Sequence, residues 1–258
     1  MEMRKVFLTQ CIHSETDIRR VSYERYIRPR FIDYSNIHGF EFIEITENLA
    51  GVHGLMFSKF FWLQQNIHNM KDGDVVTYMD TDCCIMDGRV DAVFDSDFSI
   101  VMESCGLVCT GGTWSLRISD WSRKFVYELC NVNWLLTHKG TKLYRIWNDN
   151  LIIYYVLGLK WGQQEHMIGT SANSPFTSDE LKEHVKILPA TWGCTFQSDD
   201  VNFKNNESRR AYKPYRTVSN HVKPDRACSF DDIIVRHLSA GTMQYTWAER
   251  YYNTKMKV

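Results

Sequence analysis

Two carboxylates, Asp80 and Asp82, directly follow an apolar, β-branched run at residues 75–79. A run of this kind is typical of a buried strand in a parallel sheet. Ligands of open α/β sheets bind beyond the carboxyl ends of the strands, which is where this pair falls. Carboxylate oxygens bind hard divalent cations, and such a cation can bind a diphosphate. The pair therefore predicts metal–diphosphate chemistry, and a capped strand end is the alternative interpretation.

The composition is that of a globular protein with a sizeable core, since 44% of the 258 residues are hydrophobic and 24% are charged. A formal net charge of −1 argues against a surface that binds polyanions throughout. The eight cysteines form no Cys-x-x-Cys pair, which favours reduced thiols in a cytoplasmic protein over disulfides or a zinc framework. No apolar stretch reaches about 18 residues, so we expect neither a signal peptide nor a transmembrane helix.

The first 85 residues alternate between strand and helix patterns, which is typical of a parallel, nucleotide-binding arrangement. A capping-box pattern at Ser14 predicts a helix to about Tyr26, which Pro29 kinks or restarts and Gly39 ends. Residues 56–67 carry apolar side chains at helical spacing. The predicted strands of this part are 6–8, 40–45 and 75–79.

The rest of the chain continues the mixed pattern, and no internal repeat or linker divides it. We expect helices at 121–133, with Asp120 as the cap, at 148–157 and at 243–252. A polar, basic loop spans about 198–228. The predicted strands are 99–103, 113–118, 185–188 and 233–238.

Seven short segments, spread nearly end to end, carry recognisable motifs in a fixed order: Tyr34–Phe40, Phe57–Lys59, Tyr78–Ile85, Ser115–Ser122, Trp147–Asn150, Val185–Pro189 and Ile234–Gly241. Together they resemble the GT-A glycosyltransferases of the yeast Golgi galactosyltransferase and mannosyltransferase family, which also includes plant xyloglucan xylosyltransferases. The chain departs from that pattern at Thr81, where a longer polar residue is common, and at Asp149, where the family has glutamate. We also expect no Golgi membrane anchor of the kind that this family has.

The resemblance implies one α/β domain over residues 1–258 with a GT-A (Rossmann-like) fold, in which helices flank a mixed, mostly parallel central sheet. Residues 1–110 would form the nucleotide-binding half, and residues 111–258 the acceptor-binding half with the basic loop. The implied activity is a metal-dependent, retaining sugar transfer from a UDP-linked nucleotide-sugar donor to a glycan or another hydroxyl acceptor.

The resemblance also implies a set of site residues. Asp80, Asp82 and His237 would hold Mn²⁺ or Mg²⁺, although a histidine in a strand can equally be a core residue. Asp149 and its neighbour Asn150 would act on the sugar, and the alternative for Asp149 is an acid at a helix end. The predicted donor-binding residues are Thr9, Gln10, Lys59, Asp80, Asp82, Gly112, Ser239 and Gly241.

Residues 203–226 hold seven basic side chains with interleaved aromatics, which suits a lid over the diphosphate, a nucleic-acid contact or a solvated loop. Three rival functions therefore stay open. A nucleotidyltransferase is disfavoured because no glycine-rich loop follows the first strand, and a nucleic-acid-binding module is disfavoured by the net charge. A glycosyltransferase that acts on modified DNA bases cannot be separated from one that acts on glycans.

Overall fold

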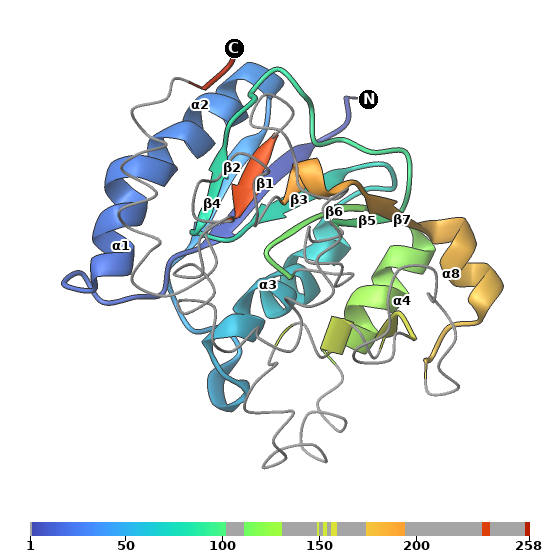
Figure 1. Cartoon of the computed structure of the whole chain (residues 1–258). Helices are drawn as coiled ribbons and strands as arrows, with labels where there is room; N and C mark the ends of the chain where they lie inside the picture. Colours follow the sequence, from blue (N-terminus) through green and yellow to red (C-terminus); the bar gives the residue numbers. More distant parts are fainter. Residues whose placement is uncertain are drawn as a thin grey trace, which may run out of the picture.

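The computed structural model of the chain (Figure 1) describes residues 2–101, 111–130, 149, 152–153, 156–158, 174–193, 234–237 and 256–258. Within them, six strands form one sheet in the order β2-β1-β3-β6-β5-β7. Strand β6 runs antiparallel to both of its neighbours, and the other five run in one direction. The strands are β1 (Lys5–Gln10), β2 (Glu41–Ile45), β3 (Val75–Met79), β5 (Phe98–Val101), β6 (Thr113–Arg117) and β7 (Val185–Leu188).

Helices cover both faces of this sheet (Figure 1). The π-helical turn Tyr23–Ile27 joins α1 to α2, and one-turn 3-10 helices flank α3 at Leu55–Phe57 and Ile67–Asn69. Two further 3-10 turns lie at Gly51–His53 and Ala190–Trp192. The helices are α1 (Ile18–Ser22), α2 (Arg28–His38), α3 (Ser58–Asn66), α4 (Asp120–Leu129) and α8 (Ser178–His184).

Alternate side chains of β1 enter two separate hydrophobic layers. Phe7 packs with Phe31 of α2 on one face, and Leu8 packs with Phe60 of α3 and Phe125 of α4 on the other. Because both faces are covered, the central strands have continuous apolar runs, with no polar alternation. The expected α/β fold, with a mixed and mostly parallel sheet flanked by helices, is confirmed.

A second, two-stranded sheet pairs β4 (Cys83–Ile85) antiparallel with β8 (Val235–His237). Its register sets Cys83 opposite His237. Strand β8 was predicted at 233–238, which is two residues too long at its start and one at its end. Strand β4 was not predicted as a strand of its own. This small sheet brings residues 235–237 beside the segment that directly follows β3.

Two helix caps differ from the prediction. Asp17, not Ser14, caps α1, because the Asp17 carboxylate accepts a hydrogen bond from the Arg19 backbone nitrogen (2.9 Å). Ser119, not Asp120, caps α4 through a reciprocal pair of side-chain bonds with Ser122. In both cases another small polar side chain, three residues after Ser14 and one residue before Asp120, caps the unpaired N–H groups instead.

The predicted boundaries of α2 are confirmed, whereas the helix expected at 121–133 ends at Leu129. Helix α2 restarts at Arg28–Pro29, as proline favours the first helical turn, and Gly39 ends it in the left-handed region (φ 69°). Helix α8 was not predicted, although Thr177 and Glu180 form a capping box in front of it. Residues 131–140, the basic loop 198–228 and the helix expected at 243–252 lie outside the described residues. No helix within the described part is long and apolar enough to cross a membrane.

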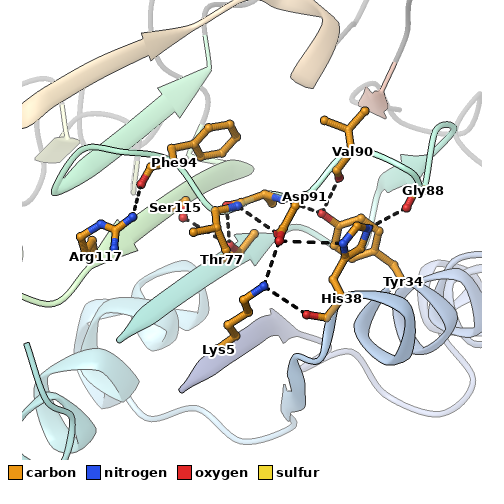
Figure 2. Close-up of polar contacts among 12 residues, drawn as sticks. Lys5, Tyr34, His38, Thr77, Gly88, Val90, Asp91, Phe94, Ser115 and Arg117 are labelled. Atoms are coloured by element: carbon orange, nitrogen blue, oxygen red, sulfur yellow. Dashed lines mark hydrogen bonds and ion pairs between the residues drawn. The ribbon is translucent and has the colours of Figure 1, made fainter. Parts of the chain in front are cut away.

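The amino edge of the sheet, where β1 and β3 begin, carries a polar cluster formed by Lys5, Tyr34, His38 and Asp91 (Figure 2). The Lys5 ammonium donates to Asp91 Oδ2 (2.9 Å) and to the His38 carbonyl (3.2 Å). The Tyr34 hydroxyl donates to the Val90 carbonyl (2.8 Å) and accepts from the Ala92 amide (2.8 Å). These bonds fasten the segment between β4 and β5 to the edge of the sheet.

Candidate functional site

Strands β1 and β3 end, and β6 begins, at the carboxyl edge of the main sheet. The Asp80 backbone nitrogen donates to the Gly112 carbonyl (2.8 Å), which extends the β3–β6 pairing by one residue. The Thr9 hydroxyl donates to the Met79 carbonyl (2.7 Å) and thereby ties the ends of β1 and β3 together. Asp80 is therefore fixed at the point where three strands meet.

Lys59 lies in the first turn of α3, directly beside this edge. Its backbone nitrogen donates to Gln10 Oε1 (3.1 Å), so the residue that ends β1 also orients the start of the helix. The Lys59 side chain is 1% exposed. Its ammonium nitrogen lies 2.6 Å from Asp149 Oδ2 and 3.7 Å from Asp80 Oδ1, and it donates to the Gly111 carbonyl (2.9 Å).

The charge state of Lys59 follows from these neighbours. Burial alone would lower the pKa of the ammonium group, but the carboxylates of Asp149 and Asp80 outweigh it, and the pKa is raised. Lys59 is therefore a permanent positive charge inside the fold. It links Asp149 to Asp80, two residues that the sequence places far apart.

Asp80 is held on its other side by Tyr78. The Tyr78 hydroxyl donates to Asp80 Oδ1, and the Tyr78 ring stacks on Trp114 with centroids 5.0 Å apart. Burial raises the pKa of Asp80; the Lys59 ammonium opposes this, and the negative charges of Asp82 and Asp149 add to it. Tyr78 thus fixes the orientation of a carboxylate whose ionised form the surroundings disfavour.

Asp82 lies beside His237, with 3.4 Å between Asp82 Oδ1 and His237 Nε2. The β4–β8 register delivers His237 to this position from the far end of the sequence. Although burial acts in the opposite direction, the nearby imidazole lowers the pKa of Asp82. One ligand atom each from Asp82, Cys83 and His237 lies within 4.8 Å of the other two. Asp80 is not part of this close group.

The donor set fits a divalent cation. Asp80, Asp82 and Asp149 supply three carboxylates that act on one another electrostatically, against the single ammonium of Lys59 and the imidazole of His237. The described part of the site therefore carries a surplus of negative charge. The side chains of Asp80 and Asp82 are about 30% and 28% exposed, so solvent reaches them. A cation reached from solvent would neutralise that surplus.

The structure brings eight predicted residues to one edge: Thr9, Gln10, Lys59, Asp80, Asp82, Gly112, Asp149 and His237. Three others, Asn150, Ser239 and Gly241, lie outside the described residues. The Thr9 and Gln10 side chains bond to the Met79 carbonyl and to the Lys59 backbone nitrogen. The chemical role of each residue stays a prediction.

Two residues of this site were not predicted from the sequence. Tyr78 was interpreted only as part of an apolar strand, although it stands two positions before Asp80 on the same face. Cys83 was interpreted as a buried thiol, since its nearness to His237 depends on a strand pairing across most of the chain. A signal for Tyr78 was available in strand geometry, because side chains two positions apart in an extended chain point to the same face.

Among the solved structures that resemble the chain are two glycosyltransferases. One is a glycosyltransferase involved in the glycosylation of the major capsid of PBCV-1, with a TM-score of 0.54 and 11% sequence identity over 98% of this chain and 100% of that one. The other is the apo-form glycosyltransferase GlyE of Streptococcus pneumoniae TIGR4, with a TM-score of 0.44 and 11% identity over 100% of this chain and 65% of that one. No family model and no curated protein matches the sequence.

At this identity, the first of these likenesses shows the fold and nothing finer. The yeast and plant family suggested by the seven sequence motifs is not confirmed. What the described residues and this likeness establish together is that the chain has a glycosyltransferase fold.

Proposed function

We propose that this protein is a metal-dependent glycosyltransferase that moves a sugar from a UDP-linked donor, with retention, to a glycan acceptor. The observation that carries the proposal is the group of Asp82 and His237, 3.4 Å apart, beside Asp80 at the carboxyl edge. Nucleotide-binding α/β folds bind their ligands at that edge. The glycosyltransferase fold of the chain supports the same assignment.

Asp82 and His237 would hold Mn²⁺ or Mg²⁺, with Asp80 as the third candidate ligand. When bound, the cation supplies Lewis-acid neutralisation of the charge that develops on the departing diphosphate. Tyr78 orients the Asp80 carboxylate, because its hydroxyl donates a hydrogen bond to Asp80 Oδ1. The other oxygen of that carboxylate takes no part in this bond. The Lys59 ammonium offsets part of the repulsion among the carboxylates and holds Asp149 close to Asp80.

Asp149 would stabilise the positive charge that forms on the anomeric carbon of the sugar. Its carboxylate is 2.6 Å from the Lys59 ammonium, which lies 3.7 Å from Asp80, so Asp149 is within one side chain of the proposed cation site. This placement supports a role in the site over that of a solvated acid at a helix end. Its predicted partner Asn150 lies outside the described residues.

The acceptor and the cellular compartment complete the proposal. Within the described ranges, no feature favours a nucleic-acid acceptor, and the basic loop that suggested one is not among them. We therefore propose a glycan acceptor, and a cytoplasmic location as expected from the cysteine pattern. Fractionation of the native protein tests the location.

The test of the function is a screen of nucleotide sugars with Mn²⁺, in which release of the nucleoside diphosphate is measured. Glycan and DNA acceptors are then examined by mass spectrometry for an added sugar. We expect hydrolysis and transfer from UDP-sugars, loss of both on EDTA treatment, and recovery on adding Mn²⁺. Transfer that survives EDTA unchanged would contradict the metal assignment, and failure with every donor would contradict the activity. The Asp91→Asn variant, altered at the opposite edge, is the matched control.

A further inference from the structure

We propose that Asp82, Cys83 and His237 form a binding site for a thiophilic divalent cation, Zn²⁺ above all, with the Cys83 sulfur as a ligand. This differs from the hard-cation set of Asp80, Asp82 and His237, because a sulfur takes the place of one carboxylate. The binding itself rests on the geometry of the small sheet. Only its consequence for catalysis rests on the proposed function.

The register of the small sheet places the thiol correctly. Cys83 stands directly opposite His237 in the antiparallel β4–β8 pair. Directly opposed residues project to the same face, with β-carbons about 4.5–5.5 Å apart. Cys84 stands opposite Arg236 and, by the alternation of strands, projects to the other face. Of these two adjacent cysteines, only Cys83 shares a face with the imidazole.

The ligand atoms are close enough for one ion to reach all three. Zinc ligands lie about 2.0–2.3 Å from the ion, which sets tetrahedral ligand atoms roughly 3.3–3.8 Å apart. Asp82 Oδ1 and His237 Nε2 are 3.4 Å apart, and the three ligand atoms lie within 4.8 Å of one another. The sulfur therefore needs to move by about 1 Å or less. Rotation about the single side-chain torsion of Cys83 provides such a movement.

The hydrogen bonds of the thiol offer little resistance to that movement. Its sulfur donates to the Gly112 carbonyl at 3.4 Å and lies 3.4 Å from the Thr113 hydroxyl. Hydrogen bonds of a thiol are weak, whereas a metal–thiolate bond is strong enough that the coordinated thiol gives up its proton to solvent. A zinc ion would thus replace two weak contacts with one strong one.

The donor types decide which cation is preferred. A thiolate, an imidazole and a carboxylate together favour Zn²⁺ over Mn²⁺ or Mg²⁺, since soft sulfur ligands select zinc and hard oxygen ligands select the other two. Three protein ligands leave one tetrahedral position open, as in catalytic zinc sites. Because Asp82 and His237 belong to both ligand sets, Zn²⁺ and Mn²⁺ cannot occupy them together. If the proposed function holds, zinc competes with the cation that supports transfer.

Cobalt substitution tests the sulfur ligand without any activity assay. Co²⁺ is added to the purified, metal-free chain, and the near-ultraviolet sulfur-to-cobalt charge-transfer band is recorded. We expect the band in the wild-type protein and in Cys84→Ser, the matched control on the other face of the strand. We expect it to be absent from Cys83→Ser and to disappear when Zn²⁺ is added. Absence of the band from the wild type, or its persistence in Cys83→Ser, would overturn the proposal.

A competition measurement extends the test to affinity. Displacement of Mn²⁺ by Zn²⁺ is followed by the electron paramagnetic resonance signal of released Mn²⁺. In Cys83→Ser, the affinity for Zn²⁺ relative to Mn²⁺ should fall by about tenfold or more. Loss of a residue that only supports a metal ligand already lowers metal affinity by about this factor. An unchanged preference in Cys83→Ser would contradict sulfur ligation. A chain that shows the cobalt band but transfers no sugar would refute the proposed function and leave this inference intact.

Discussion

Two lysines at opposite edges of the main sheet each face aspartate, and they differ in burial and in the number of carboxylates around them. At the amino edge, Lys5 pairs with one carboxylate, Asp91, at 2.9 Å, and both side chains are partly exposed (20% and 37%) (Figure 2). At the carboxyl edge, Lys59 is 1% exposed and lies near Asp149 and Asp80, with Asp82 adding a third negative charge.

The comparison shows what each edge is suited for. One ammonium and one carboxylate balance at the amino edge, where the remaining bonds go to backbone carbonyls and fasten a loop. At the carboxyl edge, one ammonium faces the carboxylates of Asp149, Asp80 and Asp82, and burial raises the pKa of Asp80. A structural ion pair needs no further charge, whereas this cluster gains stability from an added cation.

The largest expected effect is on stability, for Lys59→Met. Removal of one partner from a buried ion pair costs about 3–5 kcal/mol, and partial exposure of Asp80 puts the expected loss near the lower value. Urea unfolding measures it, and Mn²⁺ should restore part of it. Lys5→Met, the matched variant at the amino edge, should lose about 1 kcal/mol or less. Equal losses for the two variants would refute the contrast between the edges.

The next effect is on activity, for Asp82→Asn. This change removes a candidate cation ligand, so turnover of a nucleotide sugar should fall by about a hundredfold to a thousandfold, the scale for one electrostatic stabiliser. Stability without metal should fall at neutral pH, because the imidazole of His237 lowers the pKa of Asp82 and the ionised carboxylate therefore stabilises the fold. Steady-state kinetics and urea unfolding are measured on the same preparation. A stable variant with near-normal turnover would remove Asp82 from the mechanism.

Asp149→Asn should reduce turnover by about a hundredfold while donor affinity changes little, as expected for an interaction made in the transition state. The ion pair with Lys59 adds a complication, since the variant also leaves a buried ammonium with one partner fewer. The double variant Lys59→Gln/Asp149→Asn restores the local charge balance. If turnover recovers in the double variant, Asp149 acts only through Lys59, and its role on the sugar is wrong.

The smallest effect is expected for Asp91→Asn at the amino edge. The exposed pair with Lys5 contributes about 1 kcal/mol or less to stability, and Lys5 keeps its bond to the His38 carbonyl. Turnover and Mn²⁺ affinity should both match the wild type. A clear drop in either would mean that the two edges are coupled through the sheet, which the contrast drawn above does not include.

The sequence was sufficient where the signal is local. The run 75–79 and the strand 185–188 were predicted with their observed bounds. The first is a continuous apolar and β-branched run, and in the second apolar residues flank one exposed lysine, Lys186. The placement of Asp80 and Asp82 at a strand end followed from the first of these runs. Helix starts were less certain, since Ser14 and Asp120 each had a neighbour able to cap the same helix.

Local sequence patterns do not predict the contacts that form the site, because these contacts join residues far apart in the sequence. Lys59 and Asp149 are 90 residues apart in the sequence, and their ion pair exists because α3 is oriented by Gln10 at the end of β1. The approach of Cys83 to His237 depends on a strand pairing that joins distant segments. Only the resemblance to known motifs indicated that His237 belonged near Asp82, and it gave no reason to include the thiol.

The most direct test of the central claim is a titration of metal-free protein with Mn²⁺, followed by electron paramagnetic resonance, for the wild type, Asp82→Asn and Asp91→Asn. The account predicts binding by the wild type and by Asp91→Asn, tightened by UDP, with binding lost or reduced by at least about tenfold in Asp82→Asn. Equal binding by all three proteins, or none by the wild type with UDP present, would contradict a cation site at the carboxyl edge.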